Sequence, residues 1–184
     1  RCTSSAASDV YKRQSYGYGW ANLSNTPYRL FKQYDHEGGI HTPMIAQWPD
    51  KIKKKGSISH TLSHLVDLMP TILEASDITP TSKIRGHERL PWDGRSILPS
   101  IEGKKQKDPP LLFFSHARGK ALRVGNWKLV FNKDHKKEAK WELYDMKSDP
   151  NELIDLAENK PNKVRQLAQL WQQEEKEHLR KSQL

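Results

Sequence analysis

The sequence has few of the features that stabilise a chain independently of a large core. It contains one cysteine, Cys2, which excludes an internal disulfide framework and a multi-cysteine zinc site. No apolar run approaches the roughly eighteen residues of a membrane-spanning helix. Apolar residues make up only 35% of the 184 residues, and the mean hydropathy is −0.88. The sequence therefore predicts a modest hydrophobic core, and its six Trp and six Tyr argue against general disorder.

The beginning of the chain lacks the features of a natural N-terminus. It has neither an initiator Met nor the apolar region of a signal peptide, so we expect the natural N-terminus to lie upstream. Residues 1–14 have no periodicity and resemble a translated adapter, and they are set aside from the fold prediction.

The net charge of +9 and the pI near 9.6 favour partners that carry negative charge. Such partners include nucleic acid, acidic lipid and sulfated or phosphorylated substrates. The lysine runs at 53–55, 104–105 and 136–137 lie beside glycine, proline or acidic residues, which is typical of solvated loops. The charge is scattered along the chain and does not predict a single basic surface.

Residues 15–110 mix loop signals with α/β elements. Gly38 and Gly39 permit positive φ or a close backbone approach, and they predict a turn. The apolar run 44–49 ends at a proline and predicts a buried strand. Helical spacing over 62–69 and the segment 70–75 predict two short helices, with Asp67 as the cap of the second.

Residues 111–184 have a different pattern. Short apolar or alternating segments at 111–114, 121–124, 127–131 and 141–144 predict four strands, and Gly125-Asn126 predicts a tight hairpin between the second and third. A long helical pattern follows, with one apolar stripe formed by Val164, Leu167, Leu170 and Trp171. This part is predicted to be an antiparallel sheet packed on a C-terminal helix.

Several short motifs occur in an order and spacing that resemble the C-terminal portion of a type I sulfatase of the arylsulfatase kind. The resemblance covers essentially residues 20–172 and rests on these segments: Lys32 with Glu37-Gly38-Gly39-Ile40 and Thr42-Pro43, Asp67-Leu68-Met69-Pro70-Thr71, Gly94-Arg95-Ser96, residues 121–129, and Glu142-Leu143-Tyr144-Asp145. It implies the C-terminal part of an alkaline-phosphatase-like α/β fold that ends in a small antiparallel sheet. It also implies hydrolysis of sulfate esters by a formylglycine, with a calcium ion and cationic side chains holding the sulfate.

The nucleophile of that family is not found in this sequence. Asn25-Thr26-Pro27-Tyr28-Arg29 imitates part of the Cys/Ser-x-Pro-x-Arg motif, but asparagine cannot become formylglycine. Cys2 is followed by Thr-Ser-Ser and does not match either, and the paired aspartates of the calcium site are missing. We therefore expect a sulfatase fragment that is inactive alone, whose calcium ligands lie mostly outside this chain and whose own residues include no predicted metal ligand.

The resemblance assigns a catalytic role to Lys32, which lies five residues before Glu37. Its ammonium group would neutralise charge on the leaving oxygen, while Glu37 would shape the turn, because a carboxylate repels sulfate. His36 and His41 are predicted to line the substrate pocket, or else to be hydrogen-bonded structural histidines. His116 and Arg118 are further predicted substrate contacts, and simple loop polarity is the alternative.

The predicted substrates are sulfated small molecules or sulfated polysaccharides, with no nucleic-acid partner. Two alternatives stay open: a phosphodiesterase or phosphonate hydrolase of the same superfamily, and a basic module that binds polyanions without catalysis. The second would need lysines clustered with aromatic residues on one face. Relatives of the sulfatase class are usually periplasmic, secreted or lysosomal, so the parent enzyme is expected to be periplasmic or secreted.

Overall fold

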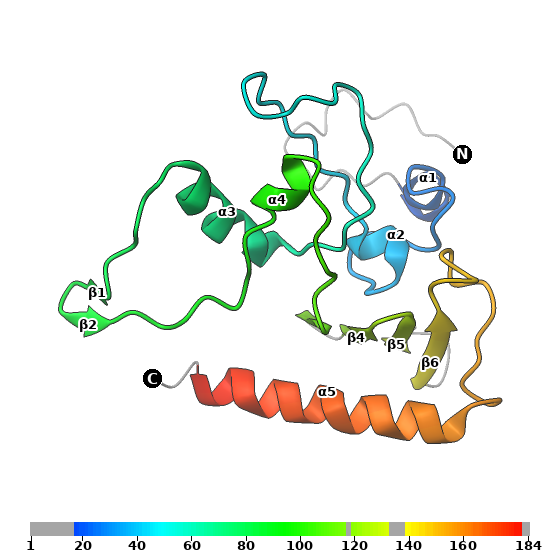
Figure 1. Ribbon diagram of the computed structural model, residues 1–184. Helices are drawn as coiled ribbons and strands as arrows, with labels where there is room; N and C mark the ends of the chain where they lie inside the picture. Colours follow the sequence, from blue (N-terminus) through cyan, green and yellow to red (C-terminus); the bar gives the residue numbers. More distant parts are fainter. Residues whose placement is uncertain (1–16, 117–118, 133–138, 182–184) are drawn as a thin grey trace, which may run out of the picture. The chain divides into compact units, whose positions relative to one another are not determined.

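The computed structural model describes residues 17–116, 119–132 and 139–181 (Figure 1). Arg118 and residues 1–14 lie outside this described part. Packing divides the chain into two compact units, one formed by residues up to 42 together with 113 onward, and the other by 43–112. We call them the sheet unit and the connecting unit. The sequence instead predicted a division at 110, which places residues 15–42 in a different segment from the sheet.

The sheet unit is built on a four-stranded sheet of order β3-β4-β5-β6. Its strands are β3 (Leu112–His116), β4 (Gly119–Val124), β5 (Trp127–Asn132) and β6 (Lys140–Asp145). The β4–β5 and β5–β6 pairs are antiparallel, and Val124 lies opposite Trp127 across the Gly125-Asn126 turn. Gly125 has φ +57°, a conformation that glycine adopts at no steric cost. The predicted strands and hairpin are confirmed.

One face of the sheet is covered by helix α5 (Pro161–Lys181), as Figure 1 shows. Trp171 is 1% exposed, and its ring stacks on Phe113 at a centroid distance of 5.4 Å. Its indole Nε1 donates to the carbonyl of Phe114 at 3.1 Å, which satisfies the buried polar atom of the ring. Leu167 is also buried. The predicted apolar stripe of this helix, and its position against the sheet, are confirmed.

The opposite face of the sheet is covered by the segment 29–42 of the same unit. Strand alternation turns Ala121, Val130 and Tyr144 to this face, where they form a cluster with Met146. Ion pairs and hydrogen bonds join the segment to β5 and β6. The segment contains the short helix α2 (Glu37–Ile40), and helix α1 (Gly17–Leu23) precedes it in the chain.

The connecting unit contains η1 (Leu65–Asp67), α3 (Leu68–Ala75), the pair β1 (Lys83–Ile84) and β2 (His87–Glu88), and α4 (Leu98–Ile101). A buried polar centre organises it. Asp67 accepts from the backbone amides of His64 and Arg95, each at 2.8 Å. Thr71 Oγ1 donates to Asp67 O at 2.6 Å and accepts from the amide of Ile97 at 2.9 Å. These bonds tie the start of α3 to the segment before α4.

Two predictions for this region are wrong. Residues 44–49 form no strand, and Ile45 is 96% exposed, because none of the described strands pairs with this run. An apolar run becomes a buried strand only when neighbouring strands satisfy its backbone groups. The helix expected over 62–69 begins only at Leu65 as a 3₁₀ turn. Asp67 lies at the N-cap position of α3, as predicted, but its side chain makes no cap hydrogen bond to this helix. Its carboxylate binds two other backbone amides instead.

Candidate functional site

Lys32 lies in an exposed turn at the beginning of the segment that covers the sheet. Two residues around it, Leu30 and Gln33, have positive φ values of 63° and 87°. Such conformations are uncommon for residues other than glycine, and they persist only where the surrounding structure imposes them. The turn is closed by the amide of Tyr34, which donates to the carbonyl of Phe31 at 3.1 Å. The backbone on which Lys32 stands is therefore held in an unusual conformation.

The two adjacent glycines explain how the turn is held. A Cβ atom on Gly38 would overlap the carbonyl oxygens of Arg29 and Leu30, and one on Gly39 would overlap the carbonyl oxygen of Tyr34. Only glycine lets α2 pack this closely against the turn. The predicted close backbone approach is confirmed, and it occurs within a short helix.

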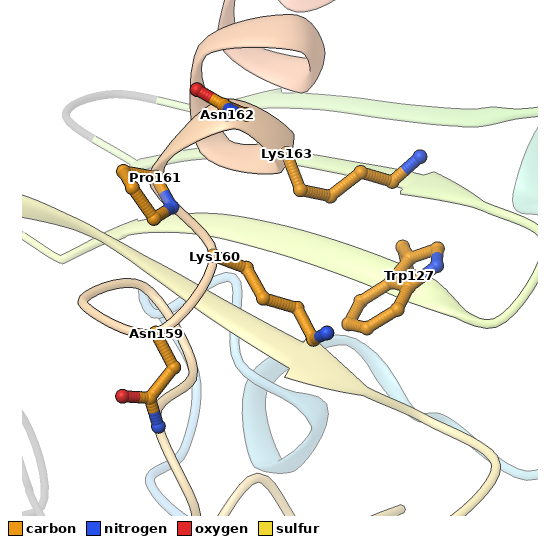
Figure 2. A pocket seen from close by; sticks show the side chains of 6 residues that line it. All are labelled: Trp127, Asn159, Lys160, Pro161, Asn162 and Lys163. Atoms are coloured by element: carbon orange, nitrogen blue, oxygen red, sulfur yellow. The ribbon is translucent and has the colours of Figure 1, made fainter.

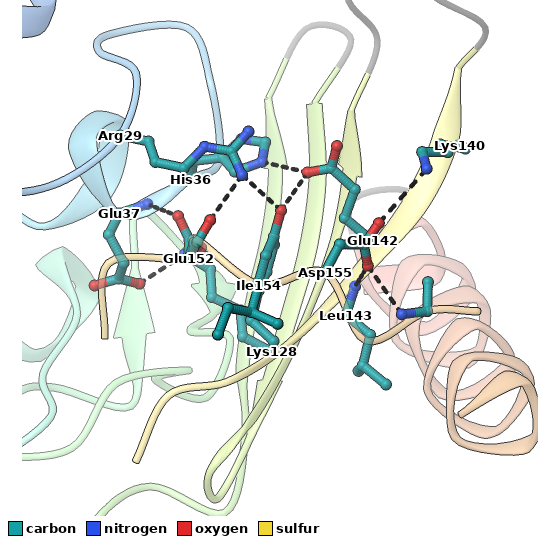
Figure 3. Close-up of polar contacts among 12 residues, drawn as sticks. Arg29, His36, Glu37, Lys128, Lys140, Glu142, Leu143, Glu152, Ile154 and Asp155 are labelled. Atoms are coloured by element: carbon teal, nitrogen blue, oxygen red, sulfur yellow. Dashed lines mark hydrogen bonds and ion pairs between the residues drawn. The ribbon is translucent and has the colours of Figure 1, made fainter. Parts of the chain in front are cut away.

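A buried ion cluster fastens α2 to the sheet (Figure 3). Lys128 is 0% exposed, and its Nζ lies 2.6 Å from Glu37 Oε1 and 2.7 Å from Glu152 Oε1. Glu152 Oε2 also accepts from the backbone amide of Glu37 at 2.7 Å. Two carboxylates thus share one buried ammonium, which is how a charged group can be kept away from water.

A second set of contacts continues from this cluster along the same face (Figure 3). Glu142 Oε2 accepts from Tyr144 Oη at 2.7 Å and lies 2.8 Å from His36 Nε2. Arg29 Nη1 donates to Tyr144 Oη at 2.9 Å and to the carbonyl of Glu152 at 2.7 Å. Segments more than one hundred residues apart in the sequence are joined here. The residues just before and just after Lys32 are therefore both anchored on the sheet.

The electrostatics of the cluster fix the protonation states of two members. Burial alone would raise the pKa of Glu37, but hydrogen bonds from His41 and the nearby Lys128 ammonium lower it to about 2. Burial, and then the hydrogen bond to the Glu142 carboxylate, raise the pKa of Tyr144. At neutral pH, Glu37 is therefore an anion and Tyr144 a neutral hydrogen-bond donor.

The predicted site residues have very different environments. His36 is 1% exposed and bound to Glu142, which is the packing expected of a structural histidine. The side chain of His41 is 48% exposed, its Nδ1 lies 2.7 Å from Glu37 Oε2, and its ring stacks on Tyr28 at 4.3 Å. His116 is exposed at the end of β3. The structure brings His36, His41 and Glu37 together behind the Lys32 turn.

Sequence reasoning did not find Lys128, Glu142 and Glu152 as members of this network. A signal was present, because Lys128 lies inside a strongly apolar strand, between Trp127 and Leu129. A lysine in such a strand is almost never buried unless it is paired. The sequence could not identify its partners, since they come from positions 91 residues before it and 24 residues after it.

The described residues do not offer a site for the calcium ion that the resemblance implies. No group of three or more His, Cys, Asp or Glu side chains in the described ranges is arranged to hold a metal ion. The carboxylates of Glu37 and Glu152 pair with Lys128, and that of Glu142 binds His36 and Tyr144. Calcium needs six to eight oxygen ligands, so these residues do not fit it.

A shallow hollow of about 420 Å³ lies where α5 begins (Figure 2). It is lined by Trp127 from β5 and by residues 159–163. Lys160 Nζ lies 5.6 Å from the centroid of the Trp127 ring. This hollow has no carboxylate among its lining residues.

None of the described helices is long and apolar enough to cross a membrane.

The sheet unit has an antiparallel sheet between a long helix and a glycine-containing segment, which is the arrangement expected of the C-terminal part of a sulfatase fold. The chain matches the family described as N-sulphoglucosamine sulphohydrolase, C-terminal, over residues 28–181. The chain belongs to this family.

Comparisons with individual proteins agree with this assignment. The chain is 32% identical to an uncharacterized sulfatase of Schizosaccharomyces pombe over 159 residues, which are 85% of this chain and 28% of that protein. It is 33% identical to N-acetylgalactosamine-6-sulfatase of Canis lupus familiaris over 59% of this chain and 19% of that protein. It thus spans less than a third of the length of these relatives.

Solved structures support the fold. A Bacteroides thetaiotaomicron structure from work on glycosaminoglycan metabolism matches 79% of this chain and 31% of its own chain, with a TM-score of 0.61 and 22% identity. The crystal structure of Ps i-CgsB matches 82% of this chain and 34% of its own chain, with a TM-score of 0.58 and 21% identity. The predicted fold class is confirmed.

Proposed function

We propose that the chain is the C-terminal part of a sulfatase that hydrolyses sulfate esters, and that Lys32 acts directly on the sulfate group. The family match over residues 28–181 carries this proposal. The structure supports the role of Lys32, because its side chain is exposed while the residues on both sides are anchored. An exposed cation on a rigid backbone can be aimed at an anion without a large loss of conformational entropy.

The proposed chemistry of Lys32 concerns the oxygen that leaves sulfur. As the S–O bond breaks, this oxygen gains negative charge, and a nearby ammonium stabilises it more in the transition state than in the bound ester. Glu37 does not offset this effect, because its carboxylate is occupied by Lys128 and His41. His41 and His116 are both exposed, and we propose that they contact the substrate. Arg118 is proposed as a third on the resemblance alone.

The isolated chain is proposed to be inactive. The segment 25–29 imitates a nucleophile motif, but its arginine serves the sheet unit: Arg29 donates to Tyr144 and to the carbonyl of Glu152. Formylglycine and the calcium ligands would come from other parts of a longer polypeptide. Calcium would supply charge neutralisation at the sulfate there. Measurable turnover of an aryl sulfate by the 184-residue chain would contradict this proposal.

Sulfated saccharides are the proposed substrate class. The family is described as N-sulphoglucosamine sulphohydrolase, and one relative is N-acetylgalactosamine-6-sulfatase, both of which are named for sulfated amino sugars. The basic composition of the chain is compatible with such substrates, since a positive surface potential concentrates polyanions near it.

The experiment that tests this function is Lys32→Ala in the longer polypeptide, assayed on a series of aryl sulfates. Loss of one well-placed donor should lower kcat by about 10²–10³, with a much smaller change in KM. The loss should be smaller for esters whose leaving phenol is more acidic, because less charge needs neutralising. Lys83→Ala, which removes an exposed lysine of the connecting unit, is the matched control.

Other results of the Lys32→Ala assay would limit or remove the role proposed for this lysine. Equal losses across all leaving groups would restrict Lys32 to sulfate binding, and unchanged kinetics would remove it from the site. Assays on aryl phosphate diesters in parallel would show whether phosphoryl rather than sulfuryl transfer is the main activity.

A further inference from the structure

Asp35 is a buried carboxyl group that the proposed reaction does not use. It is 6% exposed, and its Oδ2 accepts no hydrogen bond from any described residue. It lies three residues after Lys32 and directly before His36. Burying a carboxyl oxygen without a hydrogen bond costs free energy, because the oxygen loses its hydrogen bonds to water and forms none in their place. A buried carboxyl group that costs free energy is expected to have a function besides packing.

The position of Asp35 is set by a glycine of the sheet. Gly119 is the first residue of β4, and a Cβ atom on it would overlap both Oδ2 and Cγ of Asp35. Gly119 lies on the same face of the sheet as Ala121, by strand alternation. The Asp35 carboxyl therefore rests directly on the backbone of β4, in the space that any side chain at position 119 would occupy.

Three basic side chains act electrostatically on Asp35. Lys128 on β5, His116 on β3 and the adjacent His36 are close enough for their positive charges to favour the carboxylate. Burial opposes them and is the larger effect, so the pKa of Asp35 lies above its usual value. Asp35 thus lies near His116 in space and close to Lys32 in sequence, and these are two proposed site residues separated by more than eighty positions.

We infer that Asp35 is a positioning residue: its carboxyl, seated against Gly119, holds the Lys32 turn in a fixed place relative to His116. This inference rests on the proposed function of Lys32 for its catalytic consequence. The contact between the Asp35 carboxyl and Gly119, which we call the seat, lies within the 184-residue chain. It can therefore be tested without any enzyme activity.

The first test measures urea unfolding of the chain and of Asp35→Asn as a function of pH. The folded-state pKa of Asp35 is raised, so the folded protein holds this proton to higher pH than the unfolded chain does. The contribution of Asp35 to wild-type stability therefore falls as pH rises through that window, whereas the asparagine at position 35 in the variant does not titrate. Asp35→Asn should have a higher urea midpoint than wild type at about pH 8, and an equal one at about pH 3, below the ordinary Asp pKa.

The control for this experiment is Asp50→Asn, which changes an exposed aspartate of the connecting unit. It should show no pH-dependent gain. A lower midpoint for Asp35→Asn at neutral pH would overturn the inference, because it would mean that the carboxylate is an ordinary stabilising ion partner.

The second test displaces the Asp35 carboxyl from its position against Gly119. Gly119→Ala places a methyl group where the Asp35 carboxyl lies, so the backbone amide resonances of residues 31–34 should shift in two-dimensional NMR spectra of the chain. Gly19→Ala is the control, because a Cβ atom on this helical glycine meets open space. Unchanged resonances in the Gly119→Ala chain would overturn the inference whatever Lys32 does.

A double-mutant cycle in the longer polypeptide connects the seat to catalysis. Gly119→Ala alone should lower kcat by about 10–100-fold through misplacement of the lysine. On the Lys32→Ala background it should cause no further loss, because both changes remove the same interaction. Fully additive losses would overturn the positioning role of Asp35, but they would not contradict the proposed role of Lys32. Wild-type kinetics for Lys32→Ala would contradict the proposed function instead.

Discussion

The sheet unit and the connecting unit use the same kinds of residues with opposite results. Nearly all fully buried apolar side chains lie in the sheet unit, and Ile97 is the only one in the connecting unit among the described residues. The connecting unit instead exposes many large apolar side chains: Met44, Ile45, Ile58, Leu65, Val66, Met69, Ile72, Ile78, Ile84, Leu90 and Trp92. Burial here follows from the strands and helices that are available as partners, because an apolar segment is buried as a strand only where neighbouring strands satisfy its backbone groups.

The polar centres of the two units differ as well. In the sheet unit, Lys128 is enclosed by two carboxylates from distant segments. In the connecting unit, Asp67 accepts from two backbone amides, and no ion pair joins it to another residue in the described part of the chain. An enclosed charge is costly when a partner is lost, whereas a carboxylate on backbone amides behaves like a helix cap. The two units should therefore respond differently to the loss of one polar side chain.

The largest expected effect is that of Lys128→Met. It leaves Glu37 and Glu152 buried without their shared cation, which should lower the unfolding free energy by about 3–5 kcal/mol. Urea unfolding followed by circular dichroism measures this change. Lys83→Met removes an ion pair whose two side chains are 64% and 72% exposed, and it should change stability by less than about 0.5 kcal/mol. Equal losses in the two variants would break the comparison.

The next effect concerns apolar packing. Leu143 is 0% exposed in β6, so Leu143→Ala should lower the unfolding free energy by about 2–5 kcal/mol through lost contacts and a cavity. Ile72 on α3 is 57% exposed, and Ile72→Ala should be close to neutral, within about 0.5 kcal/mol. Thermal unfolding of both variants measures the difference. A large loss for Ile72→Ala would show that α3 packs more tightly than its exposure indicates.

Acid should weaken the sheet unit through Glu37. Its folded pKa of about 2 lies below the ordinary value of 4.5, so the folded state favours the carboxylate. Its stabilisation is present above pH 4.5 and is lost as pH falls toward 2, and the 2.5-unit difference corresponds to about 3 kcal/mol. Glu37→Gln should flatten this part of the stability profile. An unchanged profile in the variant would show that other carboxylates govern the acid transition.

The smallest of these effects belongs to the connecting unit. Asp67→Ala removes the acceptor of two amides, as the loss of a helix cap does, and should cost about 1 kcal/mol. Hydrogen exchange of the α3 amides should become faster, while the amides of β5 keep their protection. Asp50→Ala is the control, since its side chain is exposed. Faster exchange in β5 would mean that the two units do not open separately.

Much of the sheet unit could be predicted from the sequence. The Gly125-Asn126 turn, the short apolar segments beside it and the stripe containing Leu167 and Trp171 are local patterns, and they predicted the strands, hairpin and helix that the structure has. The strand predicted at 44–49 is absent because an apolar run shows only that a segment can be buried, whereas a strand also needs neighbouring strands with which to pair. Asp67 lies at the predicted N-cap position of α3, but its carboxylate binds the amides of His64 and Arg95, and Arg95 lies 28 residues away.

The candidate site divides in the same way. The sequence by itself determined where Lys32 stands, which glycines allow a close approach behind it, and which family the motifs resemble, because each of these depends on residues a few positions apart. Only the tertiary structure decided that Lys128 joins Glu37 to Glu152, that His36 is enclosed against Glu142, and that Asp35 rests on Gly119. Those contacts join segments separated by 24 to 106 positions, and their energies depend on burial, which a linear pattern of charges does not contain.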